Sequence, residues 1–260
     1  MIALSPADAP QGGPAGVTWS LLFAEEFDDT KAALLSGDAW SYGWYQADGA
    51  TLSGPTNSTE TSVYDQDQFA ITDSVASFTV GPNTHGKTHG GSTPRHLGAN
   101  LMGTGMMFDF GYVEARIRHA AGNAAEGLWP GFWLNGWTWP GDMEIDILEG
   151  DGTDQYSFNI HWDQQSGELV YDDSTGYGHH ILPSNTHSFT VPSSATVFHT
   201  YGADIRPDGV DWYVDGARIG RYTGAVPTIE RFPIIGLSTY GTVSAPKSML
   251  VDYIRIWQRT

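Results

Sequence analysis

The stretch Glu144-Ile-Asp-Ile-Leu-Glu149 decides the interpretation of this chain, because three acids alternate in it with aliphatic residues. In a regular β-strand successive side chains point to opposite faces, so the first two acids share a face and the last one does not. One extra residue around Ile147 or Leu148, a β-bulge, would return the last acid to the face of the others. The stretch therefore predicts a bulged strand that carries three carboxylates on one face.

Two close carboxylates are the groups that hydrolyse glycosidic bonds. The alternative is a solvated edge strand that happens to be acidic, in which a row of like charges would repel. The flanking sequence favours a glycan cleft, since indole rings stack on sugar rings, although tryptophan also packs in β-sandwich cores. The flanking tryptophans that we expect to contact substrate are Trp129, Trp133, Trp137 and Trp139.

Composition narrows the class of protein. The chain has 260 residues, which suits one large all-β domain or two small ones. Its net charge of −18 argues against nucleic acid as a partner, and more weakly against a sulfated or uronic-acid polysaccharide. The absence of cysteine excludes disulfides and thiolate metal sites. No apolar run reaches the length of a membrane span, so we expect no membrane insertion.

From about residue 17, short β-like runs alternate with clusters of Gly, Pro, Asn and Asp. Helical periodicity is nearly absent, apart from one short turn expected at residues 30–36. Many short strands without helices predict a sandwich or a barrel, and a long groove favours a sandwich with a bent sheet. We expect a flexible leader over residues 1–16, rich in Ala, Gly and Pro, and a single domain over 17–260. The expected strands include 69–72, 77–80, 112–119, 198–205, 210–214, 234–238 and 251–257.

Over roughly residues 17–260 the chain resembles glycoside hydrolase family 16, and within it the laminarinases (endo-1,3-β-glucanases). The resemblance implies a concanavalin-like β-sandwich, or jelly roll, with a concave substrate cleft and an endo-acting, retaining enzyme that needs no catalytic cofactor. The segments that carry it, in family order, are Phe23–Asp28, Gly111–Arg118, Gly127–Leu134, Trp139–Glu149, Asn159–Trp162, Phe198–Asp204 and Val251–Trp257.

The resemblance also implies roles for single residues. Glu144 would be the nucleophile and Glu149 the general acid/base, while Asp146 would steady the nucleophile. His161 would contact the sugar or Glu149. Retaining enzymes need two carboxyl groups only about 5–5.5 Å apart, so the strand must bend to bring the two glutamates together.

The substrate is expected to be β-1,3-glucan (laminarin) or mixed-linkage β-1,3-1,4-glucan. The bulged acid motif resembles that of laminarinases, agarases and carrageenases. Laminarinases commonly carry an arginine near residues 98–101, where this chain has Asn100 as a weaker sugar contact. That departure keeps open a galactan hydrolase of agarase type. A non-catalytic, lectin-like glucan-binding module is a third alternative, although its relatives have lost the catalytic glutamates.

Family members often hold one structural Ca²⁺ far from the reaction centre. Glu26 and Asp252 match the places of its ligands, and carboxylates with carbonyl groups suit calcium. The other interpretation is an ordinary pair of surface acids. We expect a monomer that acts outside the cell, where polymeric glycans lie, although this sequence shows no signal peptide.

Overall fold

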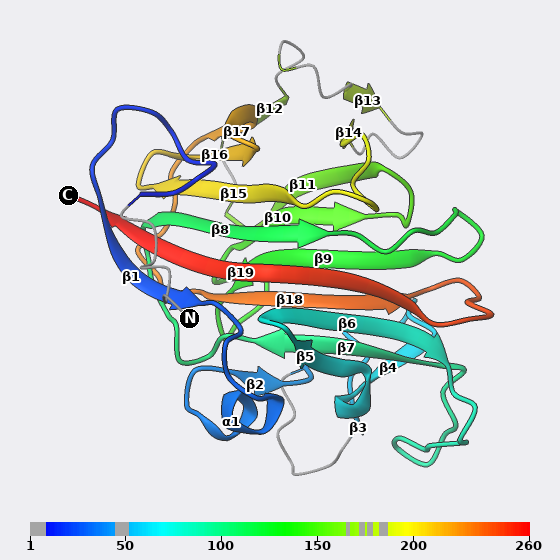
Figure 1. The fold of residues 1–260 in the computed structure, drawn as a ribbon. Coiled ribbons are helices and arrows are strands. Elements are labelled where there is room, and N and C mark those ends of the chain that lie inside the picture. Colours follow the sequence, from blue (N-terminus) through cyan, green and yellow to red (C-terminus); the bar gives the residue numbers. More distant parts are fainter. Residues whose placement is uncertain (1–8, 45–51, 165–166, 172–174, 176–178, 182–186) are drawn as a thin grey trace.

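The computed structural model describes residues 9–44, 52–164, 167–171, 175, 179–181 and 187–260 (Figure 1). The described chain is almost entirely β-structure, as expected. Its one α-helix, α1 (Lys31–Ser36), lies where a helical turn was predicted and begins after Thr30, whose side chain caps the Ala33 amide. The strands are β1 (Trp19–Glu25), β2 (Ser41–Tyr42), β3 (Leu52–Ser53), β4 (Ser62–Asp65), β5 (Phe69–Thr72), β6 (Val75–Pro82), β7 (His96–Met102), β8 (Gly111–Arg118), β9 (Leu128–Asn135), β10 (Glu144–Gly150), β11 (Gln155–His161), β12 (Glu168–Tyr171), β13 (His179–Ile181), β14 (His187–Thr190), β15 (His199–Arg206), β16 (Gly209–Val214), β17 (Ala217–Thr223), β18 (Phe232–Thr239) and β19 (Lys247–Arg259), with a 3₁₀ turn η1 (Gln66–Gln68).

The strands form a jelly-roll sandwich of two curved layers (Figure 1). The outer layer runs β12-β17-β16-β15-β8-β19-β6-β5, with β1 also paired to β19. The inner layer runs β13-β14-β11-β10-β9-β18-β7-β2. Pairing of β6 with β7 joins the two layers along one side. The acidic stretch lies on β10, in the middle of the inner layer.

The core fills the space between the layers. On β8 the alternation of side chains places Val113, Ala115 and Ile117 in this core, each with no exposed surface. Glu114, on the opposite face of β8, is also fully buried. It is covered in part by Gln11 and Gly12, whose backbone amides donate to its carboxylate. This part of the expected leader is therefore anchored, while residues 1–8 lie outside the described residues.

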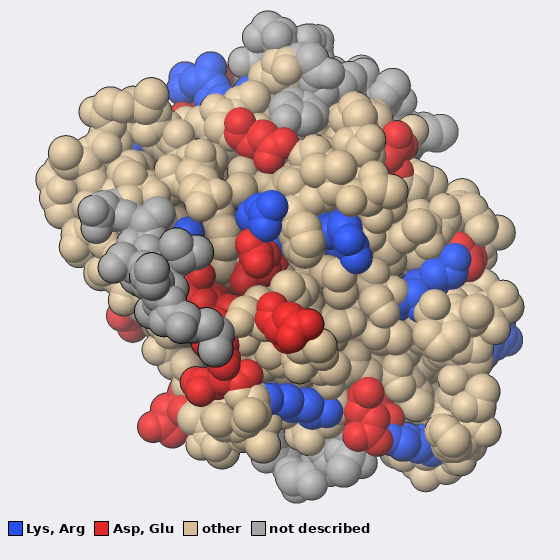
Figure 2. All heavy atoms as spheres, viewed as in Figure 1, with Lys and Arg blue, Asp and Glu red and all other residues tan. Residues whose placement is uncertain are grey.

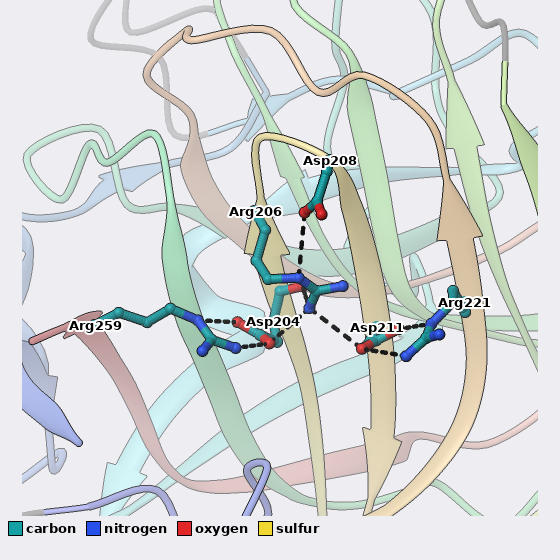
Figure 3. A network of polar contacts seen from close by, with 6 residues as sticks. All are labelled: Asp204, Arg206, Asp208, Asp211, Arg221 and Arg259. Atoms are coloured by element: carbon teal, nitrogen blue, oxygen red, sulfur yellow. Dashed lines mark hydrogen bonds and ion pairs between the residues drawn. The ribbon is translucent and has the colours of Figure 1, made fainter. Parts of the chain in front are cut away.

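The outer face of this layer carries paired charges. Figure 2 shows basic side chains beside acidic ones there, consistent with the ion pair of Arg116 with Asp252. Figure 3 shows a second group on the neighbouring strands, in which the nearly buried Asp204 and Asp211 are bridged by Arg206. The same two aspartates also bind Arg259 and Arg221, respectively. Because these contacts cross strand boundaries, they tie β15, β16, β17 and β19 together.

Candidate active site

A β-bulge in β10 places the three acids on the cleft face, as the sequence predicted. Against β11, Asp146 pairs with Asn159 and Glu149 pairs with Ser157, so two residues of β10 face one residue of β11. Against β9, the register slips between Asp146 and Leu148. The aliphatic residues of the bulge are buried beneath, and Glu144, Asp146 and Glu149 all line one cleft.

Glu144 and Asp146 gather with His161 at one point of the cleft. The Nε2 atom of His161 lies 3.3 Å from Asp146 Oδ2 and 3.9 Å from Glu144 Oε1. This contact follows from the strand pairing, since Glu144 and His161 are direct partners across β10 and β11. His161 was expected at the sugar or at Glu149; its close carboxylate contacts are with the other two acids.

Burial sets the electrostatics of these acids. Burial first, and then the neighbouring Asp146, raises the pKa of Glu144 to about 8, although His161 opposes the shift. Burial, followed by repulsion from Glu149, raises the pKa of Asp146. Two carboxylates that are close and poorly solvated cannot both ionise freely, so this pair retains a proton near neutral pH.

Glu149 is held by two donors. The indole Nε1 of Trp129 donates to its Oε1 at 3.2 Å, and the amide Nδ2 of Asn159 donates to its Oε2 at 2.7 Å. Sequence reasoning did not single out Asn159. Asn159 could have been predicted from its position two residues before His161, because such residues of a strand point to the same face.

The cleft has a volume of about 350 Å³. Several residues that line it were not predicted, because they come from segments remote from the acidic strand and carry no motif of their own. Its lining residues are Trp44, Thr56, Asn57, Tyr64, Asn100, Trp129, Gly131, Trp133, Trp139, Glu144, Asp146, Glu149, His161, Gly236 and Ser238.

The four predicted tryptophans occupy two environments. Trp129, Trp133 and Trp139 line the cleft, and Trp139 remains 60% exposed with its ring 6.5 Å from that of His161. Trp137 does not belong to the lining. It packs on Phe232 with a centroid distance of 4.9 Å and is 57% exposed.

Asn100 lies in the cleft floor but is fully buried. Its Nδ2 donates to the carbonyl of Gly43 at 2.8 Å. A Cβ on Gly236 would lie 2.4 Å from Asn100 Oδ1, so glycine is needed for the amide to fit there. The side chain thus lies just below the surface that a sugar would contact, which differs from the direct contact that was expected.

A buried arginine supports the segment that leads into β10. Arg231 is fully buried, and its Nε donates to the carbonyls of Asp142 and Met143 at 2.9 and 2.8 Å. Its terminal nitrogens bind two further carbonyls, those of Ile229 and Pro227. Met143 has a φ of 59°, an unfavourable value for a residue with a side chain, and directly precedes Glu144. Arg231 therefore fixes the backbone at the start of the acidic strand.

The two residues expected to bind calcium are engaged elsewhere. Arg255 binds Glu26 through two nitrogens, at 2.7 and 2.8 Å, and Arg116 pairs with Asp252. Within the described residues, Glu144, Asp146 and His161 form the one group of three or more potential metal-binding side chains. Glu26 and Asp252, as they lie, do not fit a shared cation site.

No helix in the described part of the chain combines the length and the apolar character needed to cross a membrane.

Comparison with known proteins identifies the family. The model of glycosyl hydrolases family 16 matches residues 57–247, and the chain belongs to this family. The endo-1,3-1,4-beta-glycanase EglC of Rhizobium meliloti is 26% identical over 263 residues, covering 90% of this chain and 51% of that protein. A beta-glucanase of Rhodothermus marinus is 24% identical, covering 57% of each chain.

The fold agrees with this family. The crystal structure of the endo-beta-1,3-glucanase from Pyrococcus furiosus superimposes with a TM-score of 0.75 at 23% identity, over 97% of this chain and 99% of that one. The chain spans about half the length of the two curated relatives described above.

Proposed function

We propose that this protein is an endo-acting, retaining β-glycanase whose substrate is a neutral β-1,3-glucan or mixed-linkage β-1,3-1,4-glucan. The observation that carries the proposal is a tryptophan-walled cleft with three acids on its floor. Among the described residues that line it there is no lysine or arginine, which suits an uncharged polymer. The names of the relatives, a 1,3-1,4-glycanase and a 1,3-glucanase, support the same substrate class.

In the first step, a carboxylate oxygen of Glu144 attacks the anomeric carbon. The glycosidic C–O bond breaks, its electron pair leaves with the oxygen, and Glu149 gives that oxygen a proton. In the second step, Glu149 takes a proton from a water molecule, whose oxygen displaces Glu144 from the anomeric carbon. Two inversions give net retention. Asp146 lies beside the nucleophile, and the proton that the buried pair retains must reside on Asp146 when Glu144 attacks.

Substrate binding is assigned to the rings around the acids. Trp129, Trp133 and Trp139 stack on successive sugar units, and His161 contacts the sugar at the cleaved bond. Trp137 extends the platform beyond the cleft. Asn100 lies beneath the cleft surface and supports the cleft floor through its hydrogen bond to Gly43. We further propose that the protein is a monomer that acts outside the cell and needs no cofactor for catalysis.

The test is a reducing-end assay on laminarin, mixed-linkage β-glucan, agarose and κ-carrageenan, with products sized by mass spectrometry. We expect oligosaccharides from one or both glucans and none from κ-carrageenan. In the Glu144→Gln variant, turnover should fall by about a thousandfold or more while the fold is retained. Cleavage of agarose without cleavage of either glucan would identify the substrate as a galactan instead. Binding without turnover of any polymer would make the protein a glucan-binding module.

A further inference from the structure

The bulge that brings the acids together has a contact from the opposite layer of the sandwich. At Asp146 the pairing of β10 with both neighbouring strands slips, so its backbone carbonyl lies where the regular ladder is interrupted. The indole Nε1 of Trp212 donates to that carbonyl at 2.8 Å. Both residues are buried, and a buried carbonyl without a partner is costly. The contact therefore stabilises the bulged form of the strand.

The ring of Trp212 is fixed at the bulge by a second contact. It stacks on Phe158 with centroids 4.7 Å apart and planes 23° apart. Phe158 is the β11 residue that faces Ile147 and Leu148, because its neighbours pair with Asp146 and Glu149. The Phe158 ring is confined further, since a Cβ on Gly220, the strand partner of Trp212, would lie 1.9 Å from it and the ring also stacks on Tyr171. The indole and the bulge are thus packed as one unit.

Ion pairs on the outer face of the sandwich hold β16, the strand that carries Trp212. Its neighbour Asp211 points to the outer face, where Arg221 and Arg206 bind it (Figure 3). Adjacent residues of a strand face opposite ways, so the ion pairs lie behind the indole. These ion pairs link β16 to β15 and β17 next to Trp212, whose indole N–H reaches Asp146 in the opposite layer.

We propose that Trp212 is a positioning residue of the catalytic acids: its N–H holds the bulge at Asp146 and so sets the placement of Glu149 relative to Glu144. The inference rests on the proposed hydrolase function. Without this donor, β10 can relax toward a regular register, which would turn Glu149 away from the cleft. The loss should affect turnover more than substrate binding, because the ring-lined walls of the cleft do not change.

The experiment replaces Trp212 by benzothienylalanine, which keeps the shape of indole and lacks the N–H. Trp212→Phe serves as a second, genetically encoded variant. We expect kcat on the cleaved glucan to fall about tenfold to a hundredfold, with KM changed less than about twofold. Hydrogen exchange across residues 146–149 should become faster in both variants, while the melting transition stays cooperative.

The matched control is the same replacement at Trp257, which is equally buried and packs on Tyr112, away from the acids. We expect a similar effect on the melting temperature and unchanged kcat. In a variant that lacks Ile147, and thus the bulge, adding Trp212→Phe should cause no further loss of turnover.

Unchanged kcat and unchanged exchange in the benzothienylalanine variant would overturn the proposal, as would equal losses of kcat from the two tryptophans. Failure of the proposed function gives a different result. In that case the wild-type protein cleaves no polymer, yet the exchange measurement still reports whether the Trp212 N–H holds the bulge.

Discussion

The amide Nδ2 of Asn159 donates to Glu149 Oε2 at 2.7 Å, on the cleft face of adjacent strands. Asn159 is the direct strand partner of Asp146, but the bulge moves its hydrogen bond to the next acid along β10. With Trp129 on the other oxygen, the carboxyl group of Glu149 is fixed in one orientation. The carboxyl group that we propose as the general acid thus depends on a side chain from the neighbouring strand.

Replacing Asn159 should therefore reduce turnover. For Asn159→Ala we expect kcat to fall about tenfold with a smaller change in KM, since one hydrogen bond contributes roughly 0.5–1.5 kcal/mol and a loss of about 1.4 kcal/mol slows a step tenfold. Asn159→Asp should be worse, because it replaces the donor by a second carboxyl group beside Glu149. Ser157→Ala, one position further along the same face of β11, is the control. A wild-type kcat in Asn159→Ala would show that Trp129 alone suffices to orient the acid.

The raised pKa of Glu144 predicts how stability depends on pH. Its pKa moves from 4.5 to about 8 on folding, so between these values the folded protein binds more protons than the unfolded chain. The contribution of Glu144 is fully present below pH 4.5 and is lost as the pH rises toward 8. Glu144→Gln, which cannot ionise, should melt at least about 2–4 °C higher than wild type at pH 8. The difference should vanish near pH 4.5. A constant difference across this range, measured by calorimetry, would contradict the assignment.

Arg231 should be important for folding although it lies outside the cleft lining. Replacing it by methionine leaves the carbonyls of Asp142 and Met143 without their buried donor. We expect the free energy of unfolding to fall by about 2–4 kcal/mol, as measured by urea denaturation. Arg221→Met, which removes an arginine that is 42% exposed and leaves Asp211 paired with Arg206, should cost less than about 1 kcal/mol. Equal costs would mean that the backbone contacts of Arg231 add nothing beyond its charge.

Two exposed tryptophans, Trp139 and Trp137, allow a test of where the cleft ends. Trp139→Ala should raise KM about tenfold, a loss of roughly 1.4 kcal/mol, with little change in melting temperature. Trp137 is similarly exposed but lies outside the cleft lining, so Trp137→Ala should change KM on short oligosaccharides less than about twofold. A larger effect on long polymers than on short ones would place Trp137 on the extended platform. Equal effects of the two variants on short substrates would extend the cleft to Trp137.

The arginine contacts of Glu26 and Asp252 predict that chelation has little effect. Treatment with EDTA should leave the melting temperature within about 1 °C, because these carboxylates already have cationic partners. A fall in melting temperature that Ca²⁺ reverses would contradict this expectation and would require the two acids to leave their arginines.

Local patterns in the sequence were enough to predict several strands, the helical turn near residues 30–36 and the bulge, since each depends on periodicity within a few residues. The contacts of single side chains were not predictable in the same way. Asn159 reaches Glu149 only through the pairing of β10 with β11, and Trp44 enters the cleft from a distant segment. Glu114 occupies a position that alternation assigns to solvent, yet residues 11 and 12 bury it. Such contacts depend on the tertiary arrangement, which no local pattern encodes.

The bulge at Ile147 also determines which genetic changes this site can tolerate. A substitution in β10 alters one side chain, whereas gain or loss of a single codon between Asp146 and Glu149 makes their spacing even, so that a regular strand without a bulge would carry both acids on one face and the register with β9 and β11 would change. A library of point substitutions would therefore miss the most sensitive property of the site, which is the number of residues between two acids. Insertion and deletion scanning would reveal this dependence on length. A compensating insertion or deletion in β9 or β11 should restore activity.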